Sequence, residues 1–320
     1  MKVIKRIILI CLVAIGILLL AACTYCLFRG LNPLALFSKA EENTRMSTFI
    51  YKTVENQDLE ADIYLPSRSL FRHSPVVFYI HGGSWKSGSR HMSGEEMDSI
   101  VNPLTDFGIT VISISYRLTD EQTKFPAHIE DVTDAIRYVV QQAAELGIDP
   151  NRMCTMGASA GAHLSLLAAM AGDQFSADPD LAETDFNIRC VVAIAGPTDL
   201  VDLSYYTPDQ RGDINDLLFS FFGARHQEIP DVYAAASPIS YINAEQPPIF
   251  MAHGEKDTLV PIAMTDQFVN LSREAGARIE YIRVFNGNHS LQPEDGDHTS
   301  PEMSEVLHEM ILFVLRNLII

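Results

Sequence analysis

Short, continuous apolar runs alternate along this chain with longer segments in which apolar residues recur every three or four positions. The runs at residues 75–80 and 109–116 are typical of buried central strands. Residues 127–146 have the helical spacing and are followed by Gly147 and Pro150, which indicates a helix with a clear end. Strands that alternate with helices in this way predict an α/β fold with right-handed crossovers and a mainly parallel central sheet flanked by helices.

The same patterns predict the other elements. We expect further strands at residues 47–54, 59–65, 153–156, 190–194, 248–253 and 279–284, and helices at residues 93–107, 164–170, 261–274 and 300–318. The first two strands are expected to form a hairpin around residues 56–58. Residues 201–243 break the alternation and are rich in aromatic side chains, so we interpret them as a cap inserted over the site. The alternative is a peripheral helical insertion that does not contact substrate.

The N-terminal part of the chain has a different character. Residues 7–28 contain no charged side chain, and Lys2, Lys5 and Arg6 precede them. This pattern predicts a membrane anchor or signal segment over residues 1–28, with the N-terminus in the cytoplasm and the catalytic domain outside it. The sequence around Cys23 resembles a bacterial lipobox, so a lipoprotein competes with an uncleaved single-pass anchor. Residues 29–45 are interpreted as a linker, and residues 46–320 as the catalytic domain.

Charge and cysteine content narrow the function classes. The formal net charge of −18 lacks the basic footprint of a nucleic-acid-binding protein and disfavours binding to anionic surfaces. Only Cys154 and Cys190 of the five cysteines belong to the globular part, and both lie in strand-like apolar runs. Buried free thiols are therefore expected, without a disulfide framework. No metal-binding spacing occurs, and no metal ion or organic cofactor is expected.

The segment around Ser159 carries the most specific chemical signal. It reads Gly-Ala-Ser-Ala-Gly over residues 157–161, with a strand-like run before it and a helical pattern after it. This is the G-x-S-x-G pattern in its strand–turn–helix context, which exposes the serine hydroxyl at the top of a sheet. The alternative is a junction of small residues with a serine that only contacts solvent. We interpret Ser159 as a nucleophile.

A serine becomes an effective nucleophile when a histidine takes its proton and a carboxylate orients that histidine. Asp257 follows the strand at residues 248–253, and His289 follows the strand at residues 279–284, so both are expected at the same sheet edge as Ser159. Asp199 competes with Asp257, as acid or as a helix cap. The competing histidines are His298 in an acidic loop and His308 in the last predicted helix.

The transition state of ester hydrolysis carries an oxyanion, which preorganised N–H groups stabilise. Gly82 and Gly83 directly follow a central strand, and their amides can approach a substrate because no Cβ intervenes. With the amide of Ala160 they would form the oxyanion hole; the alternative is an ordinary tight turn. Trp85 is interpreted as a wall of the substrate pocket. His81, His163 and His253 are assigned structural roles.

These motifs together resemble the α/β-hydrolase superfamily, and most closely its esterase/lipase branch of hormone-sensitive-lipase-like and carbohydrate-ester esterases. The matching positions are HGGSW at 81–85, SYRL at 115–118, FPA at 125–127 with Asp131, GASAG at 157–161, Asp257 and His289. The family often has a third glycine where this chain has Ser84. The resemblance implies an α/β-hydrolase fold and a Ser159–His289–Asp257 triad.

The resulting hypothesis is a serine carboxylic-ester hydrolase that forms an acyl-enzyme and acts on short-chain acyl or carbohydrate-linked esters. Two alternatives remain. The first is an amide hydrolase of the arylformamidase or dipeptidyl-peptidase type, because HGG-x-W also resembles the former. The second is a hydrolase-fold protein that binds without catalysis, although such proteins usually lose a triad member.

Overall fold

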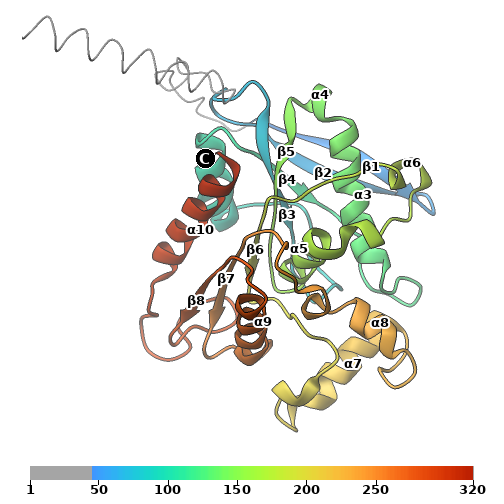
Figure 1. Ribbon diagram of the computed structural model, residues 1–320, viewed down its shortest axis with the longest axis vertical. Coiled ribbons are helices and arrows are strands. Elements are labelled where there is room, and N and C mark those ends of the chain that lie inside the picture. Colours follow the sequence, from blue (N-terminus) through green and yellow to red (C-terminus); the bar gives the residue numbers. More distant parts are fainter. Residues whose placement is uncertain (1–44, 320) are drawn as a thin grey trace, which may run out of the picture.

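A mixed sheet of eight strands forms the centre of the computed structural model, which describes residues 45–319 (Figure 1). The strands are β1 (Met46–Val54), β2 (Gln57–Tyr64), β3 (Ser74–Ile80), β4 (Thr110–Ile114), β5 (Ile148–Ala158), β6 (Cys190–Ile194), β7 (Ile249–Gly254) and β8 (Ile279–Val284). Their order across the sheet is β1-β2-β4-β3-β5-β6-β7-β8. The pairs β1–β2 and β2–β4 are antiparallel, and all pairs from β4 to β8 are parallel. The predicted mainly parallel α/β architecture is confirmed.

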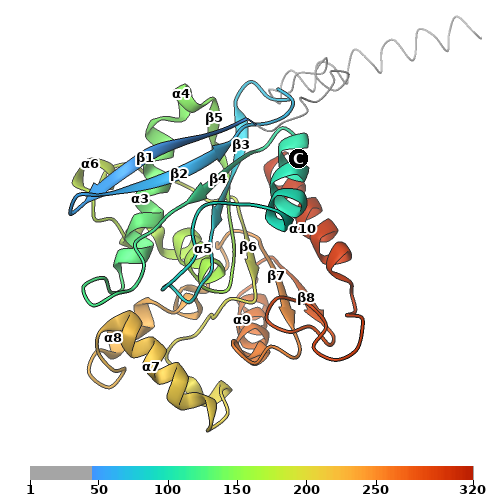
Figure 2. The same cartoon turned by 180° about the vertical axis from the view of Figure 1, so that it is seen from behind.

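Helices cover both faces of this sheet and one of its ends. The longer ones are α3 (Ala127–Gln141), α5 (Ala160–Ala171), α7 (Gln210–Phe222), α9 (Ile262–Glu274) and α10 (Met303–Leu318). The shorter ones are η2 (Met97–Val101), α2 (Asn102–Asp106), α4 (Ala143–Leu146), η3 (Gly172–Gln174), α6 (Pro179–Ala182), η4 (Leu203–Tyr205), α8 (Pro230–Ala235) and η5 (Pro238–Tyr241). Seen from either side, α7 and α8 lie together beyond the lower end of the sheet (Figures 1 and 2).

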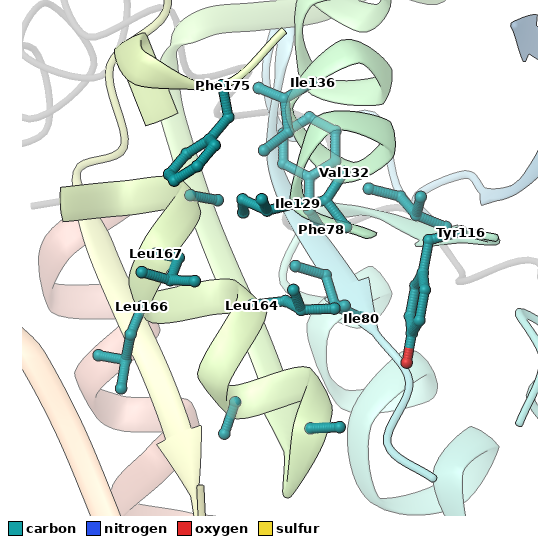
Figure 3. Packing of buried hydrophobic residues seen from close by; sticks show 14 of the residues in the cluster. Phe78, Ile80, Tyr116, Ile129, Val132, Ile136, Leu164, Leu166, Leu167 and Phe175 are labelled. Carbon is teal, nitrogen blue, oxygen red and sulfur yellow. The ribbon is translucent and has the colours of Figure 1, made fainter. Parts of the chain in front are cut away.

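The alternation of side chains along each strand divides the core between the two faces. Phe78 and Ile80 of β3 pack with α3 and α5, as Figure 3 shows with Ile129 and Leu164. Val77, which directly precedes Phe78, belongs to the opposite cluster with α2 and α10. Because successive strand residues point to opposite faces, a continuous apolar run is needed where helices cover both sides. This explains why the central strands could be recognised from sequence.

Several predicted elements differ from the structure in detail. The helix expected over residues 127–146 is two helices, because α3 ends at Gln141 and α4 follows after Gln142. The helix expected over residues 93–107 is confined to η2 and α2, which begin at Met97. The hairpin turn lies at Glu55 and Asn56, which both adopt positive φ angles, so β2 starts at Gln57. Helical periodicity does not reveal a local break when both pieces bury the same face.

Cys154 and Cys190 are buried free thiols on the neighbouring strands β5 and β6, as predicted. Within residues 45–319 no helix combines the length and apolar character needed to span a membrane. The predicted anchor at residues 1–28 and most of the linker at residues 29–45 lie outside the described residues.

A buried group of charges joins the edge of the sheet to α3. Lys52 of β1 contacts Asp131 at 3.0 Å and Asp134 at 2.7 Å, and both carboxylates are fully buried. Arg117 donates to Asp131 through its backbone amide at 2.9 Å and its Nε at 2.8 Å. Burying charges is costly unless each is paired and hydrogen-bonded, and these contacts meet that requirement for Asp131.

Candidate active site

The site lies where the direction of winding through the sheet reverses. From β3 the chain passes to β4 on one side and later returns to β5 on the other side of β3. Open α/β sheets bind ligands at the carboxyl ends of strands beside such a switch point, because the connections diverge and leave a crevice. The Gly82–Gly83 segment follows β3, and Ser159 follows β5.

Ser159 occupies a sharp turn between β5 and α5. Its backbone has φ 54° and ψ −123°, a conformation that costs roughly 1–3 kcal/mol for a non-glycine residue. The two flanking glycines allow this geometry. A Cβ on Gly161 would lie 1.9 Å from the carbonyl oxygen of Ile80, and one on Gly157 would lie 2.4 Å from the carbonyl carbon of Gly161. The spacing G-x-S-x-G is therefore a packing requirement at this turn.

Asp257 and His289 meet beside this turn. His289 Nδ1 lies 2.7 Å from Asp257 Oδ2, although the residues are 32 positions apart in sequence. The other carboxylate oxygen, Oδ1, accepts the backbone amides of Leu259 at 2.8 Å and Val260 at 2.9 Å. Burial by itself raises the pKa of Asp257, but hydrogen bonds from His253 and His289 outweigh it, so the net pKa lies below the ordinary value. An ionised carboxylate thus faces the His289 ring.

The competing residues have other positions. Asp199 Oδ1 accepts the amides of Val201 at 2.8 Å and Asp202 at 3.2 Å in the loop before η4, whose N-cap is Asp202, so Asp199 is not the helix cap considered as its alternative. His298 and His308 have exposed side chains, His298 in the loop after β8 and His308 on α10. Of the candidate acids and bases, the structure brings together Asp257 and His289.

The amides expected to form the oxyanion hole lie close to the serine. A Cβ on Gly82 would be 3.5 Å from the Ser159 Cβ, so the two backbones are neighbours. Within residues 45–319, neither Gly82 nor Gly83 donates its amide to another backbone oxygen. Ala160 is the first residue of α5, where an N–H has no intrahelical partner. Gly82 and Gly83 line the larger cavity together with Ser159, and among the described residues no backbone oxygen accepts their amides.

Two cavities meet at the serine. The first has a volume of about 220 Å³ and is lined by Trp85 and by Ile214 and Leu217 of α7. The second has a volume of about 520 Å³ and extends between residues 95–100 and α10. Both Ser159 and His289 line each of the two cavities. A group attached to Ser159 can therefore extend in two directions.

Trp85 connects the serine helix with the segment over residues 201–243. Its indole ring stacks on Phe221 of α7, with ring centroids 4.3 Å apart. The indole Nε1 donates to His163 Nδ1 at 3.2 Å, and His163 Nε2 donates to the carbonyl oxygen of Ala236 at 2.7 Å. Burial lowers the pKa of His163 to about 4, so the ring is neutral and keeps this arrangement at neutral pH. This end of α7 is therefore fixed against the site.

Comparison with known protein families shows to which family the chain belongs. The model of the BD-FAE family matches residues 61–271, which include the second half of β2, all of β3 to β7 and most of α9. The chain belongs to the BD-FAE family. This membership confirms the resemblance to the esterase/lipase branch of the α/β-hydrolase superfamily.

Named relatives agree with the BD-FAE assignment. Esterase LipQ of Mycobacterium tuberculosis is 32% identical over 227 residues, which are 69% of this chain and 51% of LipQ. A truncated carbohydrate esterase from gut microbiota is 28% identical with a TM-score of 0.70, over 88% of this chain and 99% of that one. An esterase from Thermogutta terrifontis shares the fold at 24% identity and a TM-score of 0.68, over 84% of this chain and 91% of that one. The chain spans about half the length of the curated relatives that it matches.

One contact of this BD-FAE site was not predicted from sequence. His253, to which we assigned only a structural role, lies 3.0 Å from Asp257 Oδ2. The spacing of four residues between His253 and Asp257 was the available signal. It spans the end of β7 and a turn, where sequence separation does not fix side-chain direction.

Proposed function

We propose that this chain is a serine carboxylic-ester hydrolase, with Ser159 as nucleophile, His289 as general base and acid, and Asp257 as the residue that orients His289. The observation that carries the proposal is the Asp257–His289 hydrogen bond of 2.7 Å beside an elbow serine that lines the same cavities as His289. The named esterases among the relatives support the same reaction class.

In this mechanism, Ser159 Oγ attacks the ester carbonyl carbon while His289 takes the hydroxyl proton. The resulting oxyanion accepts hydrogen bonds from the backbone N–H groups of Gly82, Gly83 and Ala160. His289 then gives its proton to the leaving alcohol oxygen as the C–O bond breaks, which leaves an acyl group on Ser159. Water, activated by His289, attacks this acyl group and releases the carboxylic acid. The Asp257 carboxylate stabilises His289 whenever the ring is protonated.

The two cavities support an assignment of the acyl and alcohol parts of the substrate to separate binding sites. We assign the acyl group to the smaller cavity, where Trp85 and residues of α7 limit the space, so that residues 201–243 act as the cap. The larger cavity then holds the alcohol. Its lining combines apolar side chains of α10 with the carboxylates of Glu95 and Glu96 and the hydroxyls of Ser99 and Ser290. Hydroxyl-rich alcohols such as sugars fit this mixture, in line with the carbohydrate esterase relative.

The location of the reaction is a further part of the proposal. Residues 7–28 would tether the catalytic domain to the membrane, outside the cytoplasm, because a charge-free stretch of this length follows three basic residues. Membrane fractionation of cells that express the full chain tests this. Recovery of the protein in the soluble fraction after lysis, with its N-terminal segment intact, would contradict the tether.

A fluorophosphonate probe tests the proposed nucleophile directly. Such a probe reacts with a serine hydroxyl that a histidine activates, so we expect covalent labelling at a single serine. Peptide mapping by mass spectrometry is expected to place the label on Ser159. A folded chain that takes no label would instead support the hydrolase-fold binding protein.

The acyl-chain preference follows from the small cavity. We expect kcat/KM for p-nitrophenyl octanoate to be at least about tenfold lower than for the acetate or butyrate ester, because one methylene too many costs about 1–3 kcal/mol in a filled pocket. Leu217→Ala should reduce this difference, since Leu217 lines the small cavity. Leu307→Ala, which enlarges only the other cavity, is the control and should leave the preference unchanged. Octanoate cleaved as fast as acetate by the unmodified chain would refute the assignment.

A further inference from the structure

A second histidine contacts the acid of the proposed triad, on the same carboxylate oxygen as His289. His253 lies at the carboxyl end of β7 and is fully buried. Its Nε2 lies 3.0 Å from Asp257 Oδ2 and 2.8 Å from the carbonyl oxygen of Val260. Its Nδ1 lies 2.8 Å from the hydroxyl of Thr265 on α9. Both ring nitrogens therefore have polar partners within the core.

The partners determine which nitrogen carries the hydrogen. Asp257 Oδ2 and the Val260 carbonyl can only accept, so His253 Nε2 must be the donor. The Thr265 hydroxyl is able to donate to Nδ1, so both ring nitrogens have a hydrogen-bond partner. The two acceptors on Nε2 therefore fix the tautomer of His253, just as the Asp257 carboxylate on Nδ1 fixes the tautomer of His289.

Asp257 is thereby held on both of its oxygens. Oδ1 accepts two backbone amides, and Oδ2 is shared between His253 Nε2 at 3.0 Å and His289 Nδ1 at 2.7 Å. Tyr206 also faces this carboxylate from residues 201–243. Burial, and then the charge of Asp257, raise the pKa of Tyr206, so it stays a neutral phenol. Without His253, one of the donors that hold Oδ2 in place is lost.

We infer that His253 is a positioning residue of the esterase reaction: it holds Asp257 Oδ2 in line with His289 and takes up part of the carboxylate charge. The inference rests on the proposed function. Partners that orient metal-ligating side chains typically change activity about 10- to 100-fold when removed, because they fix orientation and basicity, and we expect an effect of the same order for a partner that orients a triad carboxylate. The effect should fall on kcat, since His253 lines neither of the cavities that meet at Ser159.

The test compares two replacements of similar size. His253→Leu removes the donor, whereas His253→Gln can place an amide N–H near the position of Nε2. We expect His253→Leu to lower kcat for p-nitrophenyl butyrate roughly 10- to 100-fold with KM changed by less than about twofold. His253→Gln should recover most of kcat.

The pH profile separates positioning from a purely structural role. In His253→Leu the Asp257 carboxylate loses a hydrogen bond that stabilises its negative charge. The carboxylate then stabilises the protonated form of His289 more strongly. The acid limb of kcat/KM should therefore move to higher pH. Loss of thermal stability, with kcat per folded molecule and the acid limb both unchanged, would overturn the inference.

A second variant keeps the inference testable if His253→Leu does not fold. Thr265→Val removes the hydroxyl partner of Nδ1 at nearly constant volume, and we expect a smaller loss of kcat with the same direction of the acid limb. An unchanged kcat and pH profile in Thr265→Val would then overturn the inference. Ser159→Ala is measured in parallel. If Ser159→Ala keeps full activity, the proposed function has failed, whatever the His253 variants show.

Discussion

Ser159→Ala is expected to lower kcat for p-nitrophenyl butyrate by a factor of about 10⁴ to 10⁶, the range found when a triad serine is removed from a hydrolase. The alanine lacks the oxygen that would form the acyl-enzyme, so only binding and the oxyanion donors can still contribute. Because Ser159 lies at the junction of both cavities, KM should change much less than kcat. Initial rates over a range of substrate concentrations measure both quantities.

A neighbouring serine provides the matched control. Ser290 lines the larger cavity and directly follows His289, but its side chain is exposed and it does not lie on an elbow. Ser290→Ala should keep kcat within about threefold of the unmodified chain, as expected for surface changes that remove no transition-state contact. Equal turnover by Ser159→Ala and the unmodified chain would show that another group performs the hydrolysis.

Asp131→Leu is expected to lower the free energy of unfolding by about 3–5 kcal/mol, the typical effect of breaking a buried ion pair. The replacement leaves Arg117 without its buried carboxylate and leaves Lys52 with Asp134 alone. Asp131→Asn, which keeps the shape and part of the hydrogen bonding, should have a smaller effect. Urea titrations followed by circular dichroism measure the difference.

An exposed ion pair serves as the control for the effect of burial on the free energy of unfolding. Arg316 and Glu280 lie 2.7 Å apart, but their side chains are 44% and 49% exposed. Glu280→Gln should therefore change the free energy of unfolding by less than about 1 kcal/mol. If Asp131→Leu were as mild as this control, the buried charges would contribute little beyond what well-packed apolar side chains supply.

The buried ion pair between Lys52 and Asp131 is a feature that the sequence alone did not predict. Asp131 was noted as part of the family resemblance, but its partner Lys52 lies 79 residues earlier, and nothing in the β1 sequence distinguishes Lys52 from a solvent-exposed strand lysine. The contact arises because α3 packs across the edge of the sheet beside β1. A pairing between distant segments leaves no periodic trace in either of them.

The cap illustrates the same limit. Aromatic content marked residues 201–243 as unusual, yet it did not predict that Phe221 stacks on Trp85 and that His163 donates to Ala236. These contacts join the segment to the loop after β3 and to α5. They required the positions of three segments far apart in sequence, which only the folded chain brings together.

By itself, the sequence determined the features that depend on local or periodic constraints. Apolar runs and helical spacing predicted the eight strands and their order in the chain, because burial on two faces requires a continuous run. The glycines around Ser159 predicted the elbow, because no larger residue fits that turn. Tertiary structure alone decided the rest: the choice of Asp257 and His289 over their competitors, the second histidine beside Asp257, and the two cavities at Ser159. Each of these depends on side-chain directions at the ends of separate strands, and these directions are set by packing between elements.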